Sequence, residues 1–130
     1  MRGLILFAHG ARDPAWAGPL ERLRERVRAA APGTPTELAF LDIMTPDLPA
    51  AAERLIAGGC RDIVVVPIFF GQGGHVRRDL VELIAGVADR HPGISIRSAT
   101  AVGESDAVLD ALADYCLAAA AAGADNRARV

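Results

Sequence analysis

Leu4-Ile5-Leu6-Phe7-Ala8 and Ile63-Val64-Val65-Val66 are the two stretches that decide the fold of this 130-residue chain. Both are short, continuous and rich in aliphatic residues, which is the pattern of strands buried on both faces of a parallel sheet. Two further stretches, Thr36 to Leu41 and Ile94 to Val102, mix polar with apolar residues, as edge strands with one wetter face do. The sequence therefore predicts two central strands and two outer strands.

Amphipathic stripes separate these strands, with apolar residues at the spacings of three and four that define one face of a helix. The first helix is expected to open with Asp13 as its cap and Pro14 at its first position, and to expose a charged face that includes Arg24. The second is expected to follow Thr45-Pro46 and to end at Gly58-Gly59. The four stripes are Trp16, Leu20, Leu23, Val27 and Ala30; Leu48, Ala52, Leu55 and Ile56; Val76, Leu80, Leu83 and Val87; and Val108, Leu112, Tyr115 and Cys116.

Strict alternation of strand and helix requires right-handed crossovers, a parallel sheet and helices on both faces. With the first and third strands in the centre, the expected strand order is 2-1-3-4, a four-stranded relative of the flavodoxin-like order. A chain of 130 residues is the size of one domain, so we expect a single α/β domain over residues 1–117. Residues 118–130 begin with an alanine run and have no apolar stripe of their own, which predicts a frayed C-terminal tail.

Composition excludes several classes of function. A formal charge of −2 is too balanced for a protein that coats nucleic acid or a membrane surface. All 14 basic residues are arginine, so neither a lysine Schiff base nor a Walker lysine can contribute. Cys60 and Cys116 form no C-x-x-C pair. We expect both cysteines to be buried and to pack as small hydrophobic side chains. Since no run resembles a signal peptide or a membrane span, the cytoplasm is the expected location.

Polar residues follow the strands at the edge where open parallel sheets bind ligands. His9 follows the first central strand and His75 follows the second, so we expect their imidazoles to face each other across one cleft. Neutral imidazole binds divalent iron, cobalt, nickel or zinc, and it accepts protons near neutral pH. For each histidine taken alone, a capping or core role stays open. His91 is expected to be only the residue that ends the third helix.

Other groups near this edge could complete the site. Asp42 ends the second strand and could ligate a metal or support an imidazole, and a simple turn residue is the alternative. Gly71-Gln72-Gly73-Gly74 could cradle an anion, although it lacks the dinucleotide spacing. Arginines near the edge could hold carboxylates, or they could be solvated helix starts. The candidate substrate-binding residues are Gly10, Arg12, Gln72, Gly73, Gly74, Arg77 and Arg78.

Three further segments stand out in the sequence: Phe7 to Pro14, Phe40-Leu41-Asp42 ahead of Thr45-Pro46, and Val64 to Phe70 with Gly73 to Asp79. They resemble the short sirohydrochlorin chelatases of the CbiX/SirB type, and the resemblance covers Gly3 to Leu117. It implies ATP-independent insertion of cobalt, iron or, in some lineages, nickel into sirohydrochlorin, for cobalamin or sirohaem biosynthesis. His9 and His75 would be the catalytic, metal-handling residues, the divalent metal would be a substrate, and no cofactor would be permanently bound. A homodimer is also implied, because larger members contain two such halves.

Two residues depart from that family's pattern, and two other functions stay open. Ala11 stands where serine is common, and Asp42 stands where glutamate is common, so the carboxylate has a shorter stem. A non-catalytic carrier of metal or tetrapyrrole could use the same two histidines. A histidine phosphatase is a weaker alternative, because Ala8 stands where its arginine would stabilise the transferred phosphoryl group.

Overall fold

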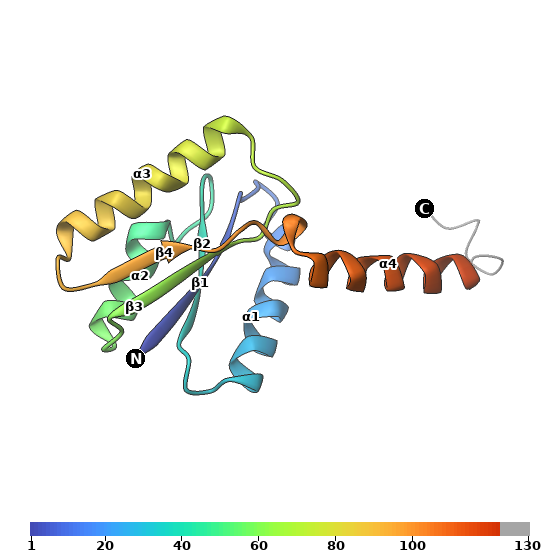
Figure 1. Ribbon diagram of the computed structural model, residues 1–130, viewed down its shortest axis with the longest axis horizontal. Helices are drawn as coiled ribbons and strands as arrows, with labels where there is room; N and C mark the ends of the chain where they lie inside the picture. Colours follow the sequence, from blue (N-terminus) through green and yellow to red (C-terminus); the bar gives the residue numbers. More distant parts are fainter. Residues whose placement is uncertain (123–130) are drawn as a thin grey trace.

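Four parallel strands form the sheet in the predicted order, β2-β1-β3-β4 (Figure 1). The computed structural model describes residues 1–122. β1 is paired along both of its edges: Leu6 lies opposite Leu38 on one side and opposite Val66 on the other. The prediction of two central and two outer strands is therefore confirmed. The strands are β1 (Arg2–Ala8), β2 (Thr36–Phe40), β3 (Asp62–Pro67) and β4 (Ser95–Ser98).

The last strand is shorter than the predicted segment from Ile94 to Val102. Within the described residues, β4 pairs with β3 alone, and β3 ends at Pro67, which has no N–H to donate to a neighbouring strand. The backbone N–H of Ala99 still donates to the carbonyl oxygen of Val65, at 2.8 Å. Beyond that bond the chain leaves the sheet and forms a short 3-10 helix, η2 (Val102–Glu104).

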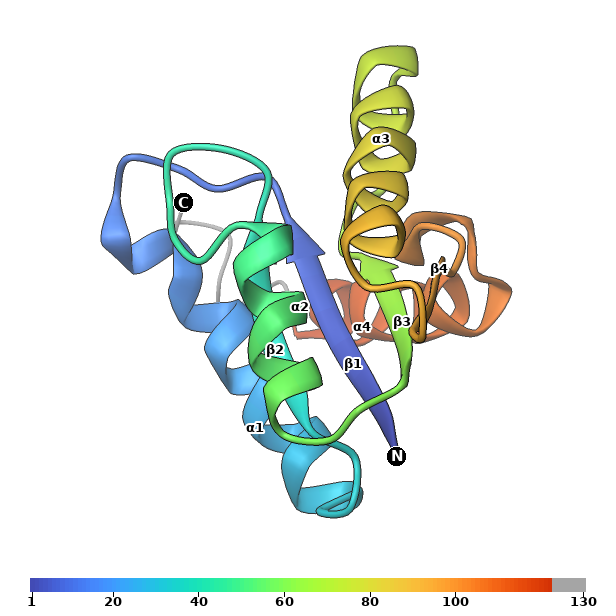
Figure 2. The same cartoon turned by 90° about the vertical axis from the view of Figure 1, so that its left-hand side faces the viewer.

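Helices cover the two faces of the sheet unequally (Figure 2). α2 and α3 pack on one face, and α1 packs on the other, chiefly over β2. α4 projects from the domain, and among the described elements its chief contact is with η2 (Figure 1). Within residues 1–122, no helix is long and apolar enough to cross a membrane. The helices are η1 (Pro14–Ala17), α1 (Gly18–Ala30), α2 (Leu48–Ala57), α3 (Gly74–Arg90) and α4 (Asp106–Ala121).

Alternate residues of the central strands supply two apolar cores. Ile5, Phe7 and Val65 point to the side of α2 and α3 and are fully buried. Leu6 and Ala8 point to the side of α1 and are also buried. The continuous apolar runs therefore reflect burial on both faces, as predicted.

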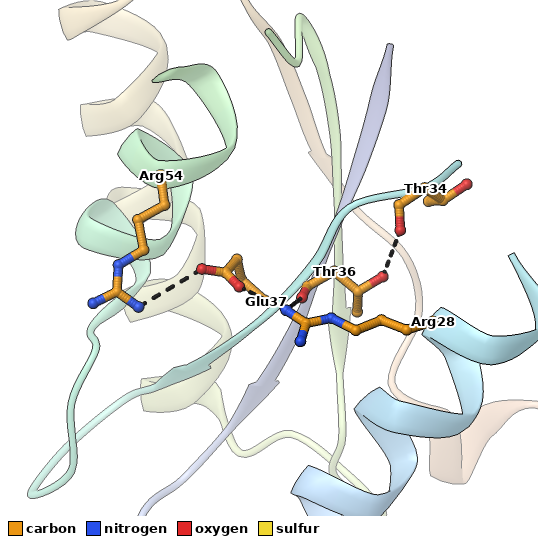
Figure 3. A network of polar contacts seen from close by, with 5 residues as sticks. All are labelled: Arg28, Thr34, Thr36, Glu37 and Arg54. Carbon is orange, nitrogen blue, oxygen red and sulfur yellow. Dashed lines mark hydrogen bonds and ion pairs between the residues drawn. The ribbon is translucent and has the colours of Figure 1, made fainter. Parts of the chain in front are cut away.

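A polar network at the start of β2 joins α1, β2 and α2 (Figure 3). Arg28 of α1 donates to the carbonyl oxygen of Thr36 at 2.6 Å and to the carboxylate of Glu37 at 3.1 Å. Arg54 of α2 lies 3.6 Å from the other oxygen of Glu37. Because both arginines are largely exposed, each ion pair contributes about 1 kcal/mol or less. The network fixes one flank of α1 against the outer edge of the sheet.

Capping side chains define where the helices begin and end. Asp13 is a cap, as predicted, but its carboxylate accepts from the N–H of Ala15 at 2.9 Å and starts η1, so α1 begins only at Gly18. Asp47 caps α2. His91 is the residue that ends α3, as predicted, and its N–H donates to the last turn of that helix.

Two predictions about side-chain burial are wrong. Arg24 is partly buried rather than solvated, and its Nε has no hydrogen-bond partner in the described part of the chain. It lies four residues after the buried Leu20, so both share the inner face of α1. Cys60 is buried as expected, but Cys116 is exposed because α4 does not pack on the sheet.

The end of α4 also differs from the sequence-based expectation. The helix continues to Ala121, so residues 118–121 are helical rather than part of a tail. Alanine has the highest helix propensity of all residues, which accounts for the continuation. The remainder of the predicted tail, residues 123–130, lies outside the described residues.

Candidate functional site

The carboxyl edge of the sheet carries both predicted histidines. His9 directly follows β1, and His75 lies in the first turn of α3, the helix that follows β3. β1 and β3 are adjacent and parallel, so their carboxyl ends lie at the same edge. Both histidines are exposed. The facing of their rings across one cleft stays a prediction.

The ring of His9 packs on Phe69. The two ring centroids are 4.3 Å apart with an interplanar angle of 37°. Phe69 is itself buried and makes an edge-on contact with Phe7, at 5.9 Å between centroids. No side-chain hydrogen bond among residues 1–122 involves the His9 ring, so its orientation depends on packing and its nitrogens face no protein partner. The sequence analysis did not predict that Phe69 packs against the ring of His9. The signal available for it was an aromatic residue just after β3.

The loop after β2 fixes the backbone around His9. The N–H of Asp42 donates to the carbonyl oxygen of His9 at 3.0 Å, and the N–H of Leu41 donates to that of Ala8 at 2.8 Å. Gly10 has φ +96°, a conformation that favours glycine, and a Cβ there would collide with the carbonyl group of Asp42. The loop after β1 and the loop after β2 therefore hold each other in place. A side chain at position 10 cannot be accommodated without displacing the backbone of Asp42.

The carboxylate of Asp42 is engaged locally rather than with the histidines. One of its oxygens accepts from the N–H of Ile43 at 2.9 Å, and its carbonyl group accepts from the N–H of Met44 at 2.7 Å. Ile43 has φ +69°, which is unfavourable for a β-branched residue. Across the described residues, no three His, Cys, Asp or Glu side chains gather into a group that could hold a metal ion. This arrangement fits the turn alternative, and metal ligation by Asp42 stays a prediction.

The glycine-rich loop leads into the amino terminus of α3. Gly73 is the cap residue, and Gly74 is the first residue of the helix. A Cβ added at Gly71, Gly73 or Gly74 would meet no atom of the described residues within 4 Å, so no contact within residues 1–122 requires glycine at these positions. The N–H groups of the first turn of a helix favour an anion, and the start of α3 lies next to this loop.

The three candidate arginines occupy different surroundings. Arg77 and Gln72 line a cavity of about 260 Å³ between α3 and the loop after β4, and Glu104 lines the same cavity. Arg78 is rotated by about 100° from Arg77 around the helix and is exposed. Arg12 is exposed in the loop after β1. The structure thus brings Gln72 and Arg77 together, and it does not add Arg12 or Arg78 to that cavity.

Two larger cavities lie away from the histidines. One of about 440 Å³ is lined by Arg28 and Arg54 at the start of β2. The other, of about 430 Å³, lies beside β2 and is lined by Arg24 and Phe40. Neither histidine lines either of these two cavities, and both histidine side chains are exposed.

Comparison with known proteins gives a family and several relatives. The sequence model of the CbiX family matches residues 3–118. The sirohydrochlorin cobaltochelatase of Methanocaldococcus jannaschii is 32% identical over 91 residues, which are 70% of this chain and 64% of that protein. That of Saccharolobus solfataricus is 34% identical over 84 residues, 65% of this chain and 64% of that protein. The chain therefore spans less than two thirds of the length of these relatives.

Two solved structures with this fold belong to proteins whose names refer to CbiX or to a sirohydrochlorin chelatase. The putative cobalamin biosynthesis CbiX protein of Marinobacter aquaeolei has a TM-score of 0.79 and 28% identity, over 89% of this chain and 94% of that one. The sirohydrochlorin chelatase SirB of Bacillus subtilis subspecies spizizenii, solved in complex with cobalt, has a TM-score of 0.71 and 26% identity. The match covers 81% of this chain and 45% of that one. The fold of the described residues is thus that of chelatases.

Replacing Gly10 by alanine is expected to lower the free energy of unfolding by roughly 1–3 kcal/mol, because the new side chain would be strained and would displace the Asp42 loop. Gly71→Ala is the matched control, with an expected change within about 0.5 kcal/mol, since open space surrounds it. Urea unfolding followed by circular dichroism measures both values. Equal, small changes in the two variants would contradict the interlocking of these loops.

Proposed function

This chain belongs to the CbiX family, and we propose that it inserts a divalent metal ion into sirohydrochlorin. Co²⁺ or Fe²⁺ is the proposed metal, with Ni²⁺ as a further candidate, and the product would serve cobalamin or sirohaem biosynthesis. The observation that carries the proposal is the exposed His9 ring, held on Phe69 at the sheet edge where His75 also lies. The names of the archaeal relatives, and the cobalt complex of SirB, support it.

The reaction needs a docking group for the metal and an acceptor for protons. The free tetrapyrrole carries two pyrrole protons, and both leave as the divalent ion enters, so the charge of the complex balances. Neutral imidazole can offer its lone pair to a first-row metal ion or take up a proton. In our proposal His9 and His75 share these two tasks, and Asp42 supports or adds to the metal contact. The metal is a substrate, and no cofactor is permanently bound.

Recognition of the tetrapyrrole is proposed to depend on its peripheral carboxylates. Guanidinium groups of Arg12, Arg77 and Arg78 pair well with carboxylates, and the N–H groups at the start of α3 favour negative charge. The open space in front of Gly73 and Gly74 supports a close approach of substrate to the backbone. Gly10 and Gln72 complete the proposed binding surface.

A homodimer is part of the proposal. The histidines of one copy lie on an exposed edge, and a flat macrocycle is excluded from water only between two walls. A second copy of the chain would supply the other wall. Symmetric pairs are the commonest assemblies of soluble proteins.

Replacing His9 or His75 by alanine is expected to lower the rate of metal insertion about 100-fold or more, because loss of a positioned base or docking group has effects of that order. Folding is expected to be nearly unchanged, since both side chains are exposed. The visible spectrum of the metallated ring gives the initial rate with Co²⁺ or Fe²⁺. His91→Ala is the control and stays active.

Equal activity in all three histidine variants would contradict the proposed roles. A wild-type protein that binds metal and ring, but forms metallated product no faster than the uncatalysed reaction, would instead be a carrier. Turnover therefore separates the two alternatives.

Losing one carboxylate-binding arginine is expected to raise KM about 3- to 10-fold with little change in kcat, because the contact exists in the ground state and the transition state alike. Initial rates of Arg77→Ala and Arg78→Ala, measured over a series of salt concentrations, test this; the effect shrinks as salt screens the exposed pairs. Arg22→Ala, on the exposed face of α1, is the control. Arg24, on the same helix, is unsuitable as a control because its side chain is partly buried. An equal rise of KM in Arg22→Ala would contradict the placement of the substrate.

A further inference from the structure

The outer edge of β2 carries no neighbouring strand among residues 1–122. In a strand, the N–H and C=O of alternate residues point to the same side. The N–H of Leu41 donates to Ala8 on the β1 side, whereas the N–H of Phe40 donates to the carbonyl oxygen of Pro46, at 2.9 Å. Leu38 lies two residues before Phe40, so its backbone N–H and C=O also point outward, away from β1.

Leu38 is the residue at this edge whose two outward groups are both left open. The carbonyl oxygen of Thr36 accepts from Arg28 at 2.6 Å, and Pro46 accepts from the N–H of Phe40. Within residues 1–122, no hydrogen bond uses the outward N–H or C=O of Leu38. An added strand would need the groups of Thr36 and Phe40 as well, so the edge suits a ligand the length of one residue.

A cavity of about 430 Å³ lies at the same edge. α1 and α2 flank β2 from the two faces of the sheet (Figure 2), and the loop after β2 borders the cavity. Its apolar wall includes Ala17, Leu38, Phe40 and Met44. Cavities of about 300–1,000 Å³ that combine an apolar wall with a few polar groups are the usual binding places of small molecules.

Two side chains of α1 with opposite charges line this cavity, Glu21 and Arg24. Residues three positions apart are neighbours on one side of a helix. Within residues 1–122, no ion pair includes either of them. Arg24 is partly buried, and its Nε is shielded from water without a hydrogen-bond partner among the described residues. A partly buried guanidinium group without an acidic partner favours an anion beside it.

The charges of the cavity select the chemistry of its ligand. A simple carboxylic acid would pair with Arg24 and be repelled by Glu21, and a simple amine would meet the reverse. A zwitterion satisfies both side chains. In a free α-amino acid one carbon atom joins the ammonium and carboxylate groups, so both reach neighbouring side chains of one helix. An apolar side chain on that carbon would leave water against Phe40 and Met44.

We propose that this cavity binds a free α-amino acid with an apolar side chain of about the size of leucine. Its carboxylate accepts hydrogen bonds from Arg24 and from the N–H of Leu38, and its ammonium group donates to Glu21 and to the C=O of Leu38. Neither histidine lines the cavity, so this site is distinct from the histidine edge. The inference does not rest on the proposed metal insertion.

The first test uses the two methionines of the chain as reporters. Met44 lines the cavity, whereas Met1 precedes β1 at the opposite edge of the sheet. The protein carries ¹³C-labelled methionine methyl groups, and neither metal nor tetrapyrrole is added. L-Leucine is expected to shift the Met44 signal with a dissociation constant of about 1 mM or below, and to leave the Met1 signal unchanged. Trp16 is the single tryptophan and packs against Phe40, so its fluorescence gives an independent reading.

Analogues of leucine show which of its groups the cavity recognises. 3-Methylbutylamine lacks the carboxylate, 4-methylpentanoate lacks the ammonium group, and glycine lacks the apolar side chain. Each is expected to bind about 5-fold or more weakly than leucine, because each leaves one part of the cavity unmatched. Equal binding of any of the three would contradict the corresponding contact and overturn the inference. Tighter binding of trileucine than of leucine would show that the edge takes a peptide, which also overturns it.

Variants of the two charged residues test the same contacts from the side of the protein. Arg24→Gln is expected to weaken leucine binding about 10-fold without weakening 3-methylbutylamine, which has no carboxylate. Glu21→Gln is expected to weaken leucine binding about 3-fold without weakening 4-methylpentanoate; its effect is smaller because Glu21 is exposed. Arg22→Gln and Glu25→Gln remove the same charges from the exposed side of α1 and are expected to leave binding unchanged.

Circular dichroism confirms that each variant is folded, and the analogue series decides the question without any variant. A Met44 signal that does not move at about 10 mM leucine would overturn the inference. The same leucine affinity in the wild-type protein and in Arg24→Gln would overturn it too. A protein that binds leucine but inserts no metal would keep the amino-acid site and contradict only the proposed reaction.

Discussion

Burial of β1 on both faces and along both edges is the constraint on which the rest of the structure depends. Its side chains alternate between the two cores, and its backbone pairs with β2 on one side and β3 on the other. A strand in this position must end in a loop at the carboxyl edge, next to the end of β3. The first residue beyond it is His9, so the same constraint that orders the sheet also exposes an imidazole at the edge where ligands bind.

On the His9 side of the site edge, neighbouring loops hold one another in place. Gly10 fits against the carbonyl group of Asp42, Phe69 supports the ring of His9, and Gly103 fits against Phe70. Two of these three contacts involve glycines that cannot carry a side chain. The glycines before α3 are different, because a Cβ added at Gly71, Gly73 or Gly74 would meet no atom of the described part of the chain. Oriented groups next to open space would suit the metal insertion proposed above.

Features that depend on a local sequence pattern could be predicted from the sequence. Features that depend on contacts between residues far apart in the chain could not. Continuous aliphatic runs identified β1 and β3, and the position of His9 and His75 after these strands followed directly. The support of His9 by Phe69 and the burial of Arg24 depend on tertiary packing, which no periodicity reveals. The stripe on α4 indicated correctly that the helix has an apolar face. It could not indicate that this face stays largely exposed in residues 1–122, because periodicity does not show whether a packing surface is available.

The central claim is that imidazoles at the carboxyl edge of β1 and β3 hold the metal during insertion. X-ray absorption spectroscopy of the Co²⁺-loaded protein tests it most directly, because it counts the imidazole ligands of the bound ion. The account predicts imidazole coordination in the wild-type protein, reduced in His9→Ala and in His75→Ala and absent in the double variant. A cobalt spectrum that is the same in the wild-type protein and the double variant would contradict it.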